Sequence, residues 1–255
     1  MIIAVNTRCL TKDQPGECSN AMYDIFNSIS TLQKEHTFIY IFDQAYDEEL
    51  SFPANVVPVI VGPIINTSVK KYFWFNVKIP QLLKKYKAEI FVSPGLCSLA
   101  TKVPQCLILN DLSFLHCPAF VNRKQLSFYK KHTRGFVKKA KSIIVLSEYS
   151  KTLISTNYKT PLDKIDVVYV GSDSGYKPVS HKVREEIKDK YADGFEYFLF
   201  TGNLNSGNNL IVLLKAFSAF KKRQKSSMKL LIACKTIIED ESFIESFRLF
   251  RFKKE

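Results

Sequence analysis

The sequence predicts an α/β protein with one doubly wound, mainly parallel Rossmann-like domain, followed by an incomplete second Rossmann-like domain. Two observations support this. Short β-rich runs alternate with helical patterns along the chain, which is typical of a parallel sheet covered by helices on both faces. The same strand–helix order starts again near Tyr197, where only about 60 residues remain, too few for a second domain of typical size.

The elements of the first domain follow from hydrophobic patterning. Strands are expected at 2–6, 37–42, 56–61, 90–93, 105–109, 142–146 and 165–169, and helices at 18–33, 69–86, 124–141 and 147–157. In the first helix, apolar residues recur at helical spacing from Met22 to Leu32. Pro80 is expected to kink or restart the second helix, because its ring removes a backbone donor.

A turn-rich segment, 171–178, predicts the linker between the two domains. We therefore place an N-terminal domain at 1–178 and a partial C-terminal domain at 179–255. The second part is expected to hold helices at 183–191 and 209–222, strands at 197–201 and 228–233, and a Phe-rich helical tail. Such a set would leave a sheet edge and an apolar helix face uncovered.

Charge is the strongest compositional anomaly. Lys and Arg total 37 against 24 Asp and Glu, a formal net charge of +13. This excess predicts attraction to phosphorylated substrates, an acidic membrane surface or nucleic acid, although a Lys-rich surface also serves solubility alone. The most apolar stretch, 56–65, is interrupted by Pro58 and Pro63, and the N-terminus lacks a signal-peptide pattern. We expect a cytoplasmic protein.

Several chemistries find no support. The six cysteines are scattered, without CxxC spacing or a His at metal-ligand spacing, so no metal site is expected. The P-loop signature and the G-x-S-x-G elbow are absent, which argues against an NTPase and a Ser-His-Asp hydrolase. No RGG run, RNP motif or zinc module accompanies the basic charge, so nucleic acid is not an expected partner.

A series of motif-like segments runs along the chain. The segments are Asn6-Thr-Arg8, 109–118 (LNDLSFLHCP), 140–151 (AKSIIVLSEYSK), 164–169 (KIDVVY) with Gly171 and 176–178 (YKP), and 197–203 (YFLFTGN) leading into 209–217 (NLIVLLKAF). This series resembles retaining glycosyltransferases of family 4, which have the two-domain GT-B fold. The joint order and spacing of the segments, over nearly the whole chain, carry the resemblance.

The resemblance implies a function. Members hold the acceptor in the N-terminal domain and a nucleotide-sugar donor in the C-terminal domain. The implied reaction transfers a hexose from a nucleotide-diphosphate sugar to a glycan or lipid-linked acceptor, with retention of configuration. The donor is a substrate, so no cofactor and no metal are implied, and catalysis depends on positioning and on stabilising the diphosphate leaving group.

The resemblance also suggests site residues, although it assigns no catalytic residue. The acceptor-binding candidates are Asn20, Asn110, Asp111, Ser147 and Glu148. The donor-phosphate candidates are Gly16, Gly202, Asn208 and Asn209. Helix N-terminal N–H groups near Asn209 would form a weak anion site.

Departures from the family pattern predict weak or absent activity for this chain. Ser19 stands where a second glycine is typical, and Glu17 adds a negative charge near the expected phosphate. The acidic loop begins Asn110-Asp111 instead of His-Asp. Gly207 and Asn208 stand where Arg and Lys are typical, a loss of about 1.5–3 kcal/mol per charged contact. The segment that would carry the family's donor-binding glutamate pair is not in the chain.

Two explanations stay open. The chain is either a glycosyltransferase by descent, truncated or completed by a second chain, or a non-catalytic binding or scaffold protein. The second would use the basic helix Lys124–Lys141 against an anionic membrane, peripherally at the inner face. Insertion is not favoured, because the apolar face of that helix is needed to cover the sheet.

Overall fold

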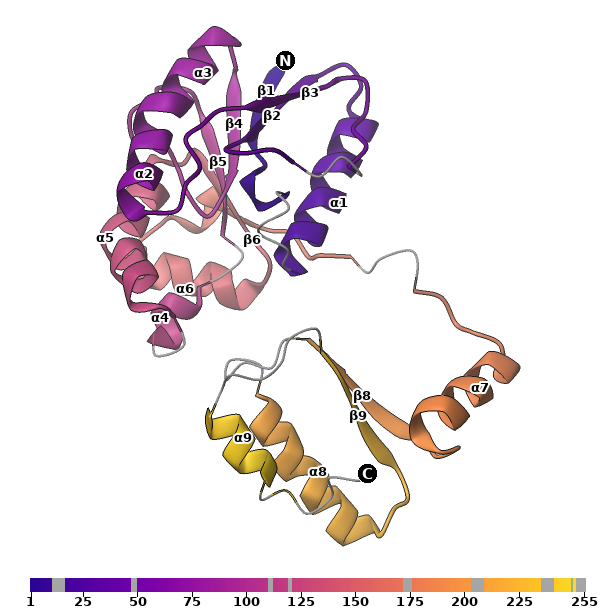
Figure 1. Cartoon of the computed structure of the whole chain (residues 1–255). Coiled ribbons are helices and arrows are strands. Elements are labelled where there is room, and N and C mark those ends of the chain that lie inside the picture. Colours follow the sequence, from indigo (N-terminus) through magenta and orange to yellow (C-terminus); the bar gives the residue numbers. More distant parts are fainter. Residues whose placement is uncertain are drawn as a thin grey trace. The chain divides into compact units, whose positions relative to one another are not determined.

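The computed structural model describes residues 1–10, 17–46, 50–109, 112–118, 121–171, 176–202, 209–234, 241–248 and 250, of which 17–21, 241–243 and 246 are described by their backbone. The chain forms two compact units, Met1–Gly171 and Ser172–Glu255 (Figure 1).

Unit 1 contains a fully parallel sheet. Its strands are β1 (Ile2–Asn6), β2 (Thr37–Phe42), β3 (Val56–Ile60), β4 (Ile90–Pro94), β5 (Gln105–Leu109), β6 (Ser142–Val145) and β7 (Ile165–Val167). Their order is β3-β2-β1-β4-β5-β6-β7, and every neighbouring pair is parallel. The chain winds outward in one direction from β1 and in the other from β4. The topological switch point, where such sheets bind ligands, therefore lies between β1 and β4.

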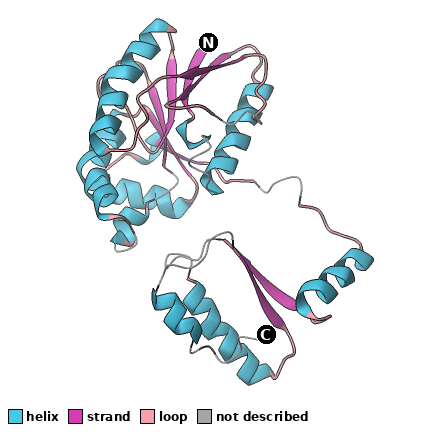
Figure 2. Cartoon of the chain, in the orientation of Figure 1, coloured by secondary structure: helices cyan, strands magenta, loops and turns pink. Residues whose placement is uncertain are grey.

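Helices cover both faces of this sheet (Figure 2). They are α1 (Glu17–Leu32), α2 (Ser68–Phe73), α3 (Ile79–Lys85), α4 (Ser113–His116), α5 (Arg123–Lys139) and α6 (Glu148–Tyr158), with 3-10 turns at Arg8–Leu10 and Leu162–Lys164. Successive side chains of β2 point to opposite faces of the sheet, so they belong to two different parts of the core. Phe38, Tyr40 and Phe42 pack with α1 on one face, whereas Ile39 and Ile41 belong to the larger cluster on the other. The predicted α/β class and mainly parallel sheet are confirmed.

The expected helix at 69–86 is divided into three parts. A π-helical turn, Trp74–Lys78, separates α2 from α3, and Pro80 lies in the first turn of α3. The helical backbone continues through the π-helical turn into α3: the Ile79 N–H donates to the Trp74 carbonyl, and Pro80, which follows, has no N–H to donate. The turn also buries Trp74, whose indole N–H donates to the Val61 carbonyl at 2.6 Å. The expected interruption of this helix near Pro80 therefore takes the form of a π-helical turn just before the proline, within a continuous helical backbone.

Unit 2 comprises α7 (His181–Ala192), β8 (Tyr197–Thr201), α8 (Leu210–Gln224), β9 (Lys229–Ala233) and α9 (Glu241–Arg248). The strands β8 and β9 pair in parallel from Tyr197↔Lys229 to Thr201↔Ala233. Leu210 and Leu214 of α8 form the centre of a small apolar cluster with side chains from both strands.

In unit 1, the last strand is shorter than expected. The strand predicted at 165–169 ends at Val167, and Val168 and Tyr169 are exposed.

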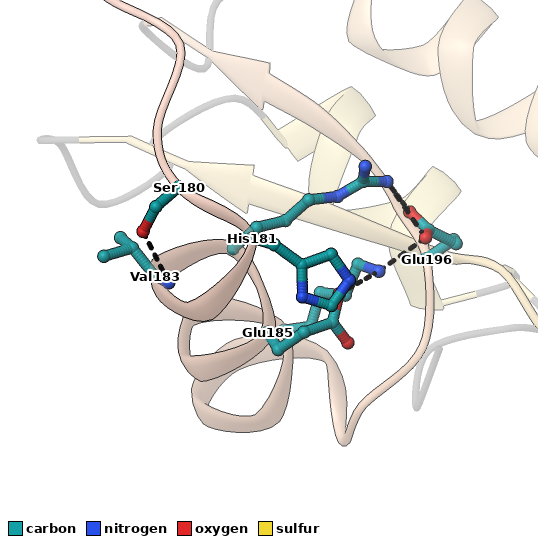
Figure 3. A network of polar contacts seen from close by, with 7 residues as sticks. Ser180, His181, Val183, Glu185 and Glu196 are labelled. Carbon is teal, nitrogen blue, oxygen red and sulfur yellow. Dashed lines mark hydrogen bonds and ion pairs between the residues drawn. The ribbon is translucent and has the colours of Figure 1, made fainter.

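A network of charged residues joins α7 to the start of β8 (Figure 3). The Arg184 guanidinium donates to both carboxylate oxygens of Glu196 at 3.0 Å, and the Lys188 ammonium contacts Glu196 and Glu185. The hydrogen bonds from Lys188 lower the pKa of Glu185 and of Glu196. In turn, the hydrogen bond to Glu196, and to a smaller extent that to Glu185, raises the pKa of Lys188. Ser180 caps α7 by accepting from the Val183 N–H.

Candidate functional site

A cavity of about 650 Å³ lies at the carboxyl edge of the unit 1 sheet. The last residue of β1, Asn6, and residues 94–96 at the end of β4 line it, so it lies at the topological switch point. The rest of the described lining comes from Arg8 and Cys9 after β1, from the segment 65–68 and Lys71 of α2, and from the start and first turns of α5. Its volume is that of a small-molecule site.

Buried polar contacts fix the floor of the cavity. The Asn6 amide donates to the Ser93 hydroxyl at 3.0 Å and so joins β1 to β4. The Arg8 guanidinium lies 3.0 Å from the Asp43 carboxylate, which also accepts from the Ile65 N–H at 2.9 Å. Arg8 and Asp43 therefore connect the loops after β1, β2 and β3. Because these groups are buried and paired, the cavity has a preorganised base.

One wall of the cavity combines a lysine with aromatic rings. The Lys71 ammonium of α2 lies 5.1 Å from the centre of the Phe128 ring of α5. Tyr129 follows Phe128 in the lining and stacks on Phe114 at 5.1 Å. Burial, and then the nearby Arg8 charge, lower the pKa of Lys71. Among the described residues, no carboxylate forms an ion pair with Lys71 to offset this cost.

The described lining is cationic. Arg8, Lys71 and Lys124 contribute to it, and no Asp or Glu occurs among its described members. Asn122 caps α5 by accepting from the Lys124 N–H at 2.9 Å, which fixes the helix end beside the cavity. Cations beside aromatic rings allow the cavity to hold an anionic group together with the apolar face of a sugar or lipid.

The acceptor-binding candidates lie elsewhere or outside the described part of the chain. Ser147 is the N-cap of α6: its hydroxyl accepts from the Ser150 N–H at 3.1 Å and contacts the Ser150 hydroxyl at 3.0 Å. Glu148 is exposed in the first turn of that helix, where a carboxylate favours the dipole. Neither residue lines the cavity. Asn20 belongs to α1 by its backbone, and Asn110 and Asp111 lie outside the described residues.

The donor-phosphate candidates are only partly described. Gly202 follows β8 with a φ of 140°, which L side chains rarely adopt. Asn209 is the N-cap of α8 in a left-handed conformation and forms no side-chain cap hydrogen bond. Gly16 and Asn208 lie outside the described residues.

Sequence patterning did not single out Lys71 as a site residue. It adjoins Lys70, and only one of the two lines the cavity. The sequence indicates Arg8 more clearly than Lys71, because the segment Asn6-Thr-Arg8 lies at the carboxyl end of the first strand. Its pairing with Asp43 joins positions 35 residues apart, which no local pattern indicates.

The family model of Glycosyltransferase Family 4 matches residues 26–175, more than half of the chain. The chain belongs to glycosyltransferase family 4. The match covers most of unit 1, including the strands β2 to β7 and the helices α2 and α5 that line the cavity. The family membership expected from the motif order is therefore confirmed.

Individual relatives are distant. The chain is 22% identical over 152 residues to O-antigen chain mannosyltransferase B of Escherichia coli, an alignment that covers 59% of this chain and 40% of the relative. The chain thus matches less than half the length of that curated relative. Similar solved structures include Anabaena Alr3699/HepE in complex with UDP-glucose, at a TM-score of 0.63 and 11% identity, covering 99% of this chain and 66% of the other.

A glycosyltransferase from Rickettsia africae aligns with a TM-score of 0.57 and 14% identity over 96% of this chain and 70% of its own length. At these identities the likeness shows the fold, which is that of GT-B glycosyltransferases. In the described part of the family 4 chain, no helix is long and apolar enough to cross a bilayer. The same residues form no cluster of His, Cys, Asp and Glu able to hold a metal ion.

Proposed function

We propose that this chain is a hexosyltransferase component that binds a nucleotide-diphosphate sugar and directs the hexose to a glycan or lipid-linked acceptor. The observation that carries the proposal is the cavity at the switch point of a family 4 fold. Two relatives support the substrate class: one is named as a mannosyltransferase, and another was solved with UDP-glucose. The donor is consumed as a substrate, and no cofactor is proposed.

The two units would have separate roles. Unit 1 would hold the acceptor in the cavity, and unit 2 would hold the donor phosphates near Gly202 and Asn209, where the N-terminal amides of α8 favour an anion. In transfer, the bond between the anomeric carbon and the phosphate oxygen breaks and the acceptor oxygen forms the new bond. The acceptor hydroxyl gives its proton to the phosphate oxygen released from the anomeric carbon, and the nucleoside diphosphate leaves.

We expect the donor affinity of this chain to be low. Gly207 and Asn208 occupy positions where the family pattern has cations, so two charged phosphate contacts are missing. A complementing chain that supplies such groups would raise the affinity. The hypothesis of a purely structural scaffold has less support, because the cavity is of ligand size and cationic.

A peripheral location at an anionic membrane surface is part of the proposal. The sequence of α5 contains seven Lys or Arg residues and no Asp or Glu. Its buried side chains include Phe128, Phe136 and Val137, which belong to the core, so insertion into lipid is disfavoured and electrostatic contact remains. The same helix lines the cavity, which would place a membrane-linked acceptor beside its site. Vesicle co-sedimentation with a salt titration tests this, and an absence of binding to acidic vesicles at low salt contradicts it.

The donor assignment is tested by calorimetry with UDP- and GDP-sugars, followed by detection of the released nucleoside diphosphate. We expect weak binding that Gly202→Val abolishes, because valine cannot adopt a φ of 140° without strain. Gly62→Ala is the matched control, since an added Cβ there meets no atom within 4 Å. Binding that Gly202→Val leaves unchanged would contradict the assignment to unit 2.

A further inference from the structure

The cationic cavity of unit 1 contains a charge that the described structure does not neutralise. Arg8 is paired with Asp43, but the described residues offer Lys71 no carboxylate. Lys71 is half-buried, contacts the face of Phe128, and lies close enough to Arg8 for repulsion to lower its pKa. Keeping an ammonium group in such a place costs stability.

An anionic ligand would offset this cost. A phosphate placed between Lys71 and the Arg8 side chain would accept charge-assisted hydrogen bonds from both, and Lys124 at the rim would add attraction. Sites at which function requires uncompensated charge are commonly less stable than their neutral variants. The arrangement therefore fits a ligand site better than a structural ion pair, which would contain its own counter-charge.

We propose that the unit 1 cavity recognises a phosphate-bearing acceptor, with Lys71 and Arg8 as its anion-binding residues and Phe128 and Tyr129 as its apolar wall. The inference rests on the proposed function, because it gives the substrate class of the acceptor site. The recognised chemistry is a phosphate monoester or diester, which either a lipid carrier or a free phosphorylated sugar can provide.

The single tryptophan of the chain provides a direct readout. Trp74 is fully buried, and the Arg8 guanidinium carbon lies 5.6 Å from its ring centre. A titration of the full-length chain with a short-chain alkyl phosphate, followed by Trp74 fluorescence and by calorimetry, should show saturable binding. Inorganic phosphate and the matching neutral alkyl alcohol are the comparison ligands. Tighter binding of the alkyl phosphate than of inorganic phosphate would indicate a lipid-linked source, and equal binding a free phosphorylated acceptor.

Matched variants assign the binding to Lys71. We expect Lys71→Gln to weaken binding of the alkyl phosphate about tenfold or more, the loss of one charge-assisted contact. Lys70→Gln makes the same charge change at the adjacent exposed residue, which does not line the cavity, and should leave binding unchanged. Lys71→Met should in addition unfold at an equal or higher urea concentration than the wild type, whereas a structural role for Lys71 predicts a lower one.

Three results would overturn the inference. They are equal binding of the neutral alcohol, equal effects of Lys71→Gln and Lys70→Gln, and binding of UDP that depends on Lys71 and is tighter than that of the alkyl phosphate. The proposed function is tested separately. If phosphate binding depends on Lys71 but no sugar is transferred, this inference holds and the proposed transferase activity is wrong. If sugar is transferred to a neutral acceptor and Lys71→Gln does not change that transfer, the transferase activity holds and this inference is wrong.

Discussion

The floor of the cavity depends on the Arg8–Asp43 pair, and Asp43→Asn tests it. The side chains are 11% and 3% exposed, and the carboxylate also accepts from the Ile65 N–H. Removing one partner of a buried ion pair costs about 3–5 kcal/mol. An amide oxygen still accepts from Ile65, and Arg8 borders a cavity that water can enter. We therefore expect a loss of about 3 kcal/mol, at the lower end of that range.

The assay is urea unfolding followed by Trp74 fluorescence, which reports unit 1 alone because the chain has no other tryptophan. Glu89→Gln is the matched control: this exposed carboxylate accepts from the Ile2 N–H, and the change should stay within about 0.5 kcal/mol. The double variant Arg8→Met/Asp43→Asn should recover part of the loss, because the buried guanidinium is then removed together with its carboxylate. Equal effects of Asp43→Asn and Glu89→Gln would refute the argument.

Three further predictions concern the surrounding fold. Ser147→Ala should destabilise unit 1 by about 1 kcal/mol in the same urea assay and leave phosphate binding unchanged, because Ser147 caps α6; a loss of binding without a loss of stability would contradict this. Leu83→Ala should cost about 2–5 kcal/mol, since the side chain is 1% exposed, and a smaller effect in thermal unfolding would mean that the core relaxes around it. Glu196→Gln should destabilise unit 2 near neutral pH, as measured by hydrogen exchange of α7. Lys188 and then Arg184 lower the pKa of Glu196 in the folded state. The difference in stability between wild type and variant should therefore persist above about pH 4.3 and vanish as the pH falls through the folded-state pKa. A stability difference that does not change with pH would contradict this.

The layered fold could be predicted because its signals are local. The continuous apolar run 38–42 marks a strand buried on both faces, and the spacing from Met22 to Leu32 marks one helix face. Pro80 predicts an interruption of the regular helix near it, because it lacks the N–H that a regular helix needs, and the π-helical turn 74–78 lies just before it.

The cavity could not be predicted in the same way, because contacts between distant residues decide it. Lys70 and Lys71 are adjacent lysines that no sequence pattern distinguishes. Only the packing of α2 against Phe128 of α5 shows which of them lines the cavity. Arg8 and Asp43 lie in different loops, which meet because β1 and β2 are paired in parallel. Several motif-based candidates, Asp111 among them, fall outside the described residues and stay predictions.

A crystal structure of the full-length chain soaked with a short-chain alkyl phosphate would test the central claim most directly. We predict density for the phosphate within hydrogen-bonding distance of the Lys71 ammonium and the Arg8 guanidinium, with the alkyl chain along Phe128. A phosphate bound only in unit 2, or a unit 1 cavity that contains solvent alone at saturating ligand, would contradict the account.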